Sequence, residues 1–187
     1  MRVLVACEFS GIVRDAFTAR GHDAMSCDIL PTESLGNHYQ GDVFDIIDDG
    51  WELMIARPPC TYLTNSGVRR LHSDPKRWPK LFDAAYFFKA LLEADIPKKA
   101  IENPIMHKYA KRLIGRDQAQ VIQPWMFGHG ETKATCLWID GLPKLEPTNI
   151  VDGRESRIHS LPPSEDRSKL RSITYRGIAQ AMAEQWG

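Results

Sequence analysis

The stretch that most constrains the fold is residues 51–64, which read WELMIARPPCTYLT. The apolar run at residues 53–56 is typical of a buried strand, and prolines at positions 58 and 59 follow it. Because proline cannot donate a backbone hydrogen bond to a sheet, we expect the strand to end there and to place Cys60 in a loop. Ligands of open α/β sheets bind at this carboxyl edge, so Cys60 is a candidate nucleophile. The alternative is a small buried hydrophobic residue, since free cysteine is among the most buried residue types.

A second candidate strand opens the chain. Residues 3–6 form a short apolar run, and the turn EFSG separates it from a helix expected over residues 12–20. Ser10 is the candidate N-cap of this helix, whose first turn would offer free backbone N–H groups. Together with the close backbone approach that Gly11 allows, the turn suits an anionic group of a cofactor. A single glycine is a weaker signal than GxGxxG, and alone it chiefly indicates the fold.

Two aspartates suggest what the cofactor contains. Residues 24–27 predict a strand that ends at Asp28, about twenty residues after the first turn, where an acidic residue commonly accepts hydrogen bonds from ribose hydroxyls. Asp28 therefore favours a nucleoside-containing cofactor, against the alternative of a solvated loop aspartate. Asp42 follows irregular chain at residues 30–40 and is a second candidate polar contact.

The proline ending occurs twice. Residues 99–101 predict a short strand that ends in Glu102-Asn103-Pro104. If the strands at 53–56 and 99–101 are parallel neighbours, Cys60 and Glu102 converge on one cleft. A thiol beside a carboxyl group suggests covalent chemistry with acid assistance.

Residues 61–80 are polar and show no clear period, which predicts a long loop. Cations that include Arg69 and Arg70 alternate there with Tyr62 and Trp78, a mixture that suits a phosphate backbone and bases. Solvated surface charge is the alternative. Further elements are expected as helices at 81–94, 107–114 and 175–186 and as strands at 119–123 and 134–139.

These elements predict an α/β fold with a mostly parallel sheet flanked by helices. A chain of 187 residues with 43% hydrophobic residues is long enough for one core and short for two, so residues 1–187 are expected to form a single compact domain. Lys plus Arg and Asp plus Glu number 24 each, so overall charge does not identify a partner.

The expected location is the cytoplasm. The four cysteines form no CxxC pair, and the chain opens directly on a strand pattern without a signal peptide. No apolar stretch approaches the roughly 20 residues that span a bilayer, which argues against a membrane role. Cysteine and histidine pairs with zinc spacing are lacking, so no metal site is expected.

The order of these motifs resembles that of the cytosine-5 DNA methyltransferases. The specific part is Pro58-Pro59-Cys60 followed by Glu102-Asn103-Pro104, and the looser matches extend over nearly the whole chain. These looser matches are Phe9-Ser10-Gly11, Asp28-Ile29, Asp42, residues 131–139, residues 154–159 and the last helix. The resemblance implies a Rossmann-like class I methyltransferase fold that binds S-adenosylmethionine.

The resemblance also assigns roles to residues of this chain. It implies that Ile29 packs on the adenine of the cofactor, that Cys60 adds to C6 of cytosine, and that Glu102 hydrogen-bonds or protonates N3. A base in a duplex must first leave the stack. The candidate cofactor residues are Phe9, Ser10, Gly11, Asp28, Ile29, Asp42 and Pro58, and the candidate catalytic residues are Cys60, Glu102 and Lys133. The candidate substrate-binding residues are Asn103 and, from the composition of residues 61–80 rather than from the resemblance, Arg69 and Arg70.

Several positions depart from the family pattern. Val13 replaces a glycine, Thr61 replaces a glutamine, and Lys133 and Thr135 replace an arginine pair. Residues 140–152 occupy the place of a target-recognition domain and are too few to fold into one. The protein therefore methylates with little sequence preference, takes specificity from a partner protein, uses a substrate other than duplex DNA, or has lost catalysis.

Three hypotheses follow. The first is an S-adenosylmethionine-dependent cytosine-5 methyltransferase that acts on nucleic acid, in the first place DNA. The alternative is a noncatalytic module of the same fold that binds cofactor, nucleotide or a partner protein. A structural metal protein is the third and has the least support.

Overall fold

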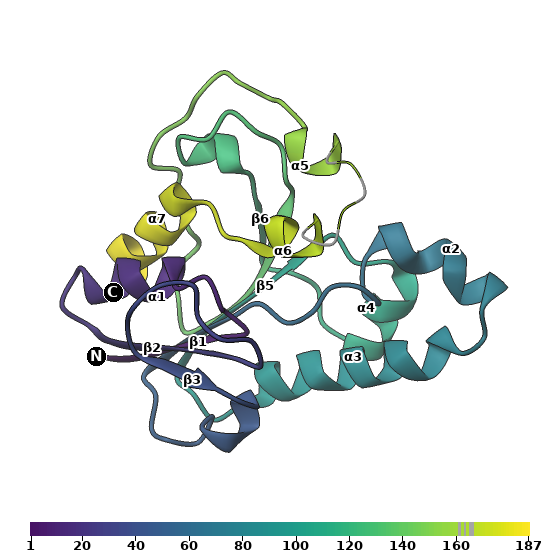
Figure 1. Ribbon diagram of the computed structural model, residues 1–187, viewed down its shortest axis with the longest axis horizontal. Coiled ribbons are helices and arrows are strands. Elements are labelled where there is room, and N and C mark those ends of the chain that lie inside the picture. Colours follow the sequence, from purple (N-terminus) through teal and green to yellow (C-terminus); the bar gives the residue numbers. More distant parts are fainter. Residues whose placement is uncertain (161, 163, 165–166) are drawn as a thin grey trace.

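The structure is a computed structural model that describes residues 1–160, 162, 164 and 167–187. Its centre is a seven-stranded sheet with the order β3-β2-β1-β4-β5-β7-β6 (Figure 1). The first five strands pair in parallel, and β7 pairs antiparallel with both β5 and β6. The strands are β1 (Arg2–Ala6), β2 (Asp23–Asp28), β3 (His38–Gln40), β4 (Leu53–Ala56), β5 (Lys98–Pro104), β6 (Gln120–Ile122) and β7 (Thr135–Asp140).

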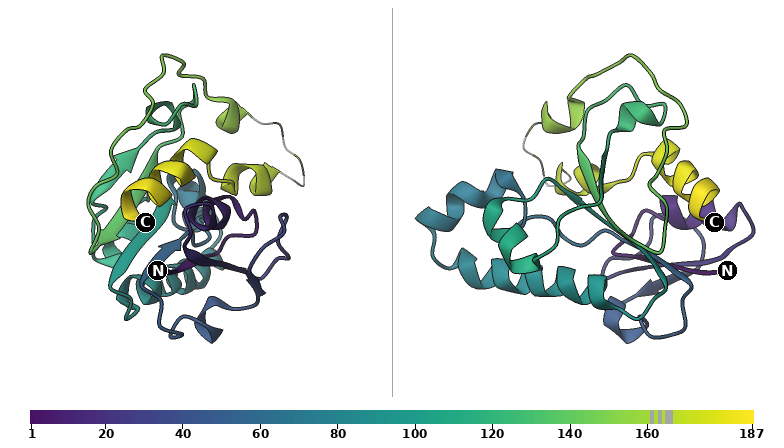
Figure 2. Two further views of the ribbon diagram at one scale, coloured as in Figure 1. Left: turned by 90° about the vertical axis from the view of Figure 1, so that its left-hand side faces the viewer. Right: turned by 180° about the vertical axis from the view of Figure 1, so that it is seen from behind.

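Helices cover both faces of this sheet (Figures 1 and 2). Alternate residues of a strand point to opposite faces. In β1, Val3 and Val5 pack with the helices α1 and α7, whereas Leu4 and Ala6 face the core formed with α3 and α4. The helices are α1 (Ile12–Thr18), α2 (Asn65–Ser73), α3 (Arg77–Glu93), α4 (Lys108–Ile114), α5 (Arg157–Ser160), α6 (Arg167–Ser172) and α7 (Arg176–Trp186), with 3₁₀ turns η1 (Val43–Asp45) and η2 (Pro124–Met126).

The predicted α/β class is confirmed, and the sheet is mostly parallel and flanked by helices. The order from β3 to β5 is that of a doubly wound sheet, whose ligands bind outside the carboxyl ends of the strands. In the part of the chain that the structure describes, no helix is both long and apolar enough to cross a bilayer. The expectation of a single domain stays a prediction.

The prediction of a long loop at residues 61–80 is wrong. The structure places α2 there, and α3 begins at Arg77 rather than near residue 81. Helix α2 is polar on average, so no apolar run marks it, yet its residues are amphipathic at helical spacing, and it buries Leu71 and packs Val68 on the same core. A helix can therefore form here on a narrow apolar face that packs on the core.

Candidate functional site

The ends of β4 and β5 lie side by side at the carboxyl edge of the sheet. The two strands are parallel neighbours, as the sequence predicts, and Ala56 pairs with Ile101 in the register. Arg57 directly follows this pair at the end of β4, and Glu102 follows it within β5. Their side chains form an ion pair with 3.6 Å between Arg57 Nε and Glu102 Oε2. Arg57 was not among the predicted site residues, although a charge at the end of a buried apolar run is a usable signal.

The loop that follows β4 is held firmly. Asn103 Nδ2 donates to the Pro58 carbonyl oxygen at 3.1 Å, and the Cys60 carbonyl accepts from the backbone N–H groups of Leu63 and Thr64. Asn103 is buried and follows Glu102 on the strand, so the two side chains point to opposite faces of the sheet. Asn103 therefore fixes the loop that presents the half-buried Cys60, and its predicted contact with substrate stays a prediction.

Charged groups from separate elements surround the Cys60 thiol. Burial raises the pKa of Cys60, while Arg171 of α6 and Lys133 lower it and Glu102 raises it. Burial also lowers the pKa of Lys133, against the opposing influence of Glu102. The structure thus brings together Cys60, Glu102 and Lys133, the three predicted catalytic residues, and adds Arg171, which no sequence signal indicated.

Lys133 is also fixed in place. Its Nζ donates to the Ile173 carbonyl at 3.2 Å and lies 5.7 Å from the centroid of the Tyr175 ring. Tyr175 in turn donates to Glu131 at 2.6 Å, and Glu131 pairs with Arg157 of α5 at 2.9 Å. These contacts tie the residue 131–133 segment to the C-terminal part of the chain, which lies over the site.

The rate at which Cys60 reacts with an alkylating reagent should depend on its pKa, which burial and the nearby charges shift. Because burial raises the thiol pKa, we expect alkylation of Cys60 by iodoacetamide to become faster with pH beyond pH 9. Lys133→Met removes a cation that favours the thiolate, so it should slow alkylation at pH 8 by about threefold to tenfold. Mass spectrometry of the modified peptide gives the rate, and Lys144→Met at an exposed position is the control. A rate that levels off below pH 8 would show that the thiolate already exists in the resting protein.

The turn after β1 differs from the prediction. The buried Glu8 carboxylate accepts from the backbone N–H groups of Val13 at 2.8 Å and Arg14 at 3.1 Å. Gly11, at φ 74°, rather than Ser10, is the N-cap of α1. The expected free N–H groups for an anionic ligand are therefore not available at these two positions, because an acidic side chain of the chain itself occupies them.

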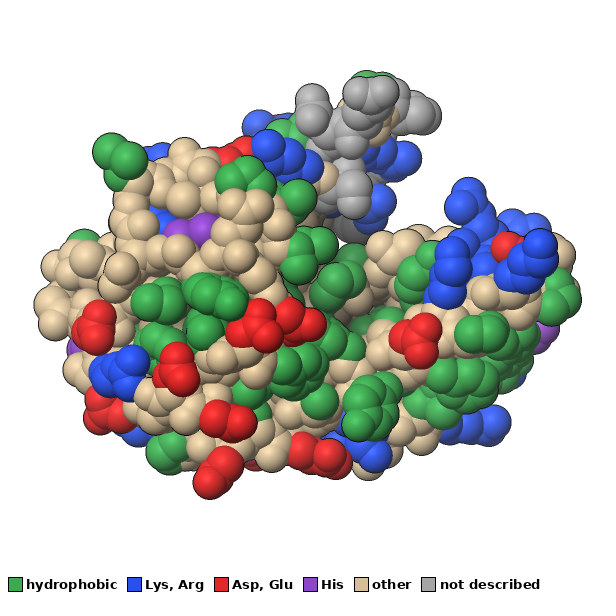
Figure 3. Space-filling view, turned by 60° about the horizontal axis from the view of Figure 1, so that its bottom comes forward, with side chains coloured by type: hydrophobic (Ala, Val, Ile, Leu, Met, Phe, Trp, Pro, Cys, Tyr) green, Lys and Arg blue, Asp and Glu red, His purple; other side chains and the backbone are tan. Residues whose placement is uncertain are grey.

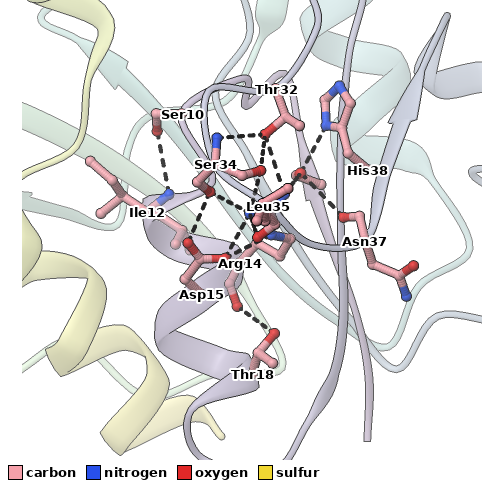
Figure 4. A network of polar contacts seen from close by, with 12 residues as sticks. Ser10, Ile12, Arg14, Asp15, Thr18, Thr32, Ser34, Leu35, Asn37 and His38 are labelled. Carbon is pink, nitrogen blue, oxygen red and sulfur yellow. Dashed lines mark hydrogen bonds and ion pairs between the residues drawn. The ribbon is translucent and has the colours of Figure 1, made fainter.

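Arg14 also joins α1 to residues 30–37 (Figure 4). The Arg14 side chain, 1% exposed, donates to Ser26 Oγ and to the Leu35 carbonyl, each at 3.1 Å. A Cβ atom on Gly11 would collide with Ser34 Oγ and the Arg14 guanidinium. Glycine is therefore required here by the packing of the chain itself, in addition to its positive φ.

The predicted adenosine-binding residues lie along the carboxyl edge near β1 and β2. Asp28 ends β2 and accepts from the Leu30 N–H at 2.9 Å, and the adjacent Ile29 side chain is exposed by 76%. Asp42 caps η1 by accepting from the Phe44 N–H at 3.1 Å. An acidic acceptor beside an exposed apolar side chain fits a ribose and the ring attached to it. The remaining predicted cofactor residues, Phe9, Ser10 and Pro58, are buried at this edge.

Basic side chains lie on α2, at the start of α3 and on α6. Arg69 and Arg70 are exposed on α2, and the Arg77 guanidinium at the start of α3 lies 4.7 Å from the centroid of the Tyr62 ring. On the other side, α6 carries Arg171 and Lys169, and Lys169 pairs with Glu33 and lies 5.5 Å from the centroid of the Phe9 ring. Figure 3 shows Lys and Arg side chains on both sides of a notch between α2 and the α5–α6 region.

The part of the chain that the structure describes contains no group of three or more His, Cys, Asp or Glu side chains placed to hold a metal ion. All four cysteines are free thiols.

No protein-family model and no curated protein sequence matches the chain. Among solved structures, it is similar to a candidate DNA modification methyltransferase encoded within a prophage, from E. coli, with 19% identity, a TM-score of 0.49, and 81% of this chain covered. It is also similar to the Entamoeba histolytica methyltransferase EhMeth, with 14% identity, a TM-score of 0.48 and 88% of this chain covered. The matches cover 52% and 60% of those two chains.

Proposed function

We propose that the protein is an S-adenosylmethionine-dependent methyltransferase that modifies C5 of cytosine in DNA. The observation that carries this proposal is the convergence of Cys60, Glu102 and Lys133 at the carboxyl edge of the sheet. A thiol, a carboxyl group and an amine that share one site are suited to covalent catalysis with acid–base assistance.

The proposed cofactor fits the edge beside these residues. Asp28 and Asp42 would bind polar groups of the adenosine, and Ile29 would pack on the adenine ring and become buried. The cofactor, when bound, supplies an electrophilic methyl group on a sulfonium sulfur. Glu8 occupies the start of α1, so the methionine carboxylate must find donors elsewhere.

The residues of the chain would activate the base. Burial lowers the pKa of Lys133, so its amine is neutral more readily than usual and could accept the proton of the Cys60 thiol, whose own pKa burial raises. The thiolate then adds to C6, and Glu102 in its carboxylic acid form would donate a hydrogen bond or proton to N3, where negative charge appears. C5 becomes nucleophilic and accepts the methyl group. A base takes the C5 proton, the electron pair of that C–H bond re-forms the C5–C6 double bond, and the Sγ–C6 bond breaks to release the Cys60 thiolate.

The substrate class follows from the surface. Basic side chains of α2 and α6 on the two sides of the notch suit a nucleic-acid backbone. Between β7, which ends at Asp140, and α5, which begins at Arg157, the chain forms no further helix or strand. A sequence-reading element that enters a groove is normally a helix or strand pair, so specificity would come from a partner protein or be low.

One assay tests the proposal. Labelled S-adenosylmethionine is incubated with the protein and separate pools of duplex DNA, single-stranded DNA, RNA and deoxycytidine nucleotides. The proposal predicts label at C5 of cytosine in a DNA pool. Label in another pool would name a different substrate, and no label in any pool despite cofactor binding would identify the noncatalytic module.

Cofactor binding is measured separately by thermal unfolding. S-Adenosylhomocysteine at about 100 times its Kd should stabilise the fold by about 2.7 kcal/mol, which raises Tm by roughly 5–10 °C in a chain of this size. Asp28→Ala should remove most of this shift, while Asp95→Ala at an exposed position in another loop should keep it. A wild-type Tm that does not change at millimolar ligand would contradict the proposed cofactor.

A further inference from the structure

Arg57 is a buried cation with an unused hydrogen-bond donor. The side chains of Arg57 and Glu102 are only 9% and 11% exposed. Their separation of 3.6 Å is too long for a hydrogen bond, and Arg57 Nε has no hydrogen-bond partner among the residues that the structure describes. A buried donor without a partner is costly and uncommon in folded proteins. A ligand that accepts a hydrogen bond from Arg57 Nε would explain why this donor is buried without a partner.

The balance of charge around Glu102 also indicates that a ligand group binds beside Arg57. Lys133 is influenced by both Glu102 and Arg57, so once its amine has taken the thiol proton two cations lie near one carboxyl group. One ionised carboxylate would balance at most one of these charges, and Arg171 near Cys60 adds a third cation. The surplus positive charge suits negative charge that appears on a substrate during reaction.

The chemistry of the base identifies where that charge appears. When Cys60 Sγ bonds to C6 and its proton passes to Lys133, the electron pair of the C5–C6 double bond moves into the C4–C5 bond. The displaced charge is shared between N3 and, through the adjacent carbonyl, O2. Glu102 accounts for N3 in the proposed mechanism, and O2 still needs a donor.

We propose that Arg57 is a catalytic residue whose guanidinium donates to the cytosine O2 as the thiol adds. This inference rests on the proposed function. It gives a physical reason why the strand at residues 131–139 can carry Lys133 and Thr135 where the cytosine-5 methyltransferase pattern has arginines, because the guanidinium now comes from the end of β4.

A purely structural role for Arg57, as the counter-charge of Glu102, makes a different prediction. Arg57→Lys keeps the charge but loses the planar guanidinium and its Nε donor. Under the structural role lysine should restore function, whereas under our proposal it should not. The matched control is Arg116→Lys, which makes the same change in an ion pair with Asp140 outside the site.

The test compares wild type with three variants: Arg57→Lys, Arg116→Lys and the double variant Arg57→Gln/Glu102→Gln. The double variant removes both charges of the buried pair, so neither charge is left unpaired and the fold should be kept. Three quantities are measured with a cytosine-containing single strand: Tm, the kcat of methyl transfer, and the release of tritium from C5-labelled cytosine, which reports reversible thiol addition. We expect Arg57→Lys to keep the wild-type Tm and to change KM by no more than about twofold. Its kcat and its rate of tritium release should fall by about 10²–10³-fold, as for loss of one oxyanion donor. Arg116→Lys should match wild type, and the double variant should fold and show no tritium release.

The outcomes separate this inference from the proposed function. An active Arg57→Lys variant with unchanged tritium release would overturn the role of Arg57 and leave the methyltransferase intact. Tritium release that depends on Arg57 without any methyl transfer would support the role of Arg57 and contradict methylation. A wild type that does neither would overturn both.

Discussion

Cys60→Ser is expected to reduce kcat by about 10³-fold or more, because a serine hydroxyl is scarcely ionised near neutral pH and cannot replace a thiolate in addition to C6. Labelled methyl transfer to cytosine-containing DNA measures this loss. The Tm shift by S-adenosylhomocysteine should persist, since Cys60 follows β4 whereas the proposed adenosine contacts follow β2 and β3.

The matched control is Cys136→Ala. Cys136 is buried in β7, and burial also raises its pKa. Its replacement should leave methyl transfer within a few-fold of wild type. Methyl transfer that continues in Cys60→Ser would show that the reaction does not pass through this thiol.

The second large effect is on stability. Arg14→Met should lower the free energy of unfolding by about 3–5 kcal/mol, because the buried guanidinium makes hydrogen bonds to five residues, and the partners that are buried lose theirs. The partners are Asp15, Ser26, Thr32, Ser34 and Leu35. Chemical denaturation measures the loss, and the variant should also bind S-adenosylhomocysteine more weakly, since residues 30–37 follow Ile29 directly.

Arg20→Met provides the comparison for this variant. Arg20 is exposed just beyond the end of α1, so the same change should alter stability by no more than about 0.5 kcal/mol. If Arg14→Met were as stable as Arg20→Met, the network in Figure 4 would contribute nothing to the fold.

The sequence predicts most of the sheet because its signals are local. Apolar runs at residues 3–6 and 53–56 identify buried strands, and prolines after β4 and at the end of β5 mark where those strands stop. Two strand ends that share one edge were enough to predict that Cys60 and Glu102 converge.

The parts that were missed depend on contacts between distant residues. β3 (His38–Gln40) is short and polar, and α2 is polar on average, with only a narrow apolar face that packs on the core. In the sequence, Glu8 is simply part of the turn after β1. Only the structure shows that its carboxylate accepts hydrogen bonds from the first backbone N–H groups of α1. Arg171 lowers the pKa of Cys60 because α6 folds back over the sheet. The sequence contains no local signal for that tertiary placement.

The most direct test of the central claim is covalent trapping with an oligonucleotide that carries 5-fluorocytosine, incubated with protein and S-adenosylmethionine. Fluorine cannot leave C5 as a cation after methyl transfer, so the Sγ–C6 bond should persist. The account predicts one adduct per protein, mapped by mass spectrometry to Cys60, in wild type and Cys136→Ala and absent from Cys60→Ser. An adduct at Cys7, Cys27 or Cys136, or methylation of normal cytosine without any trapped complex, would contradict it.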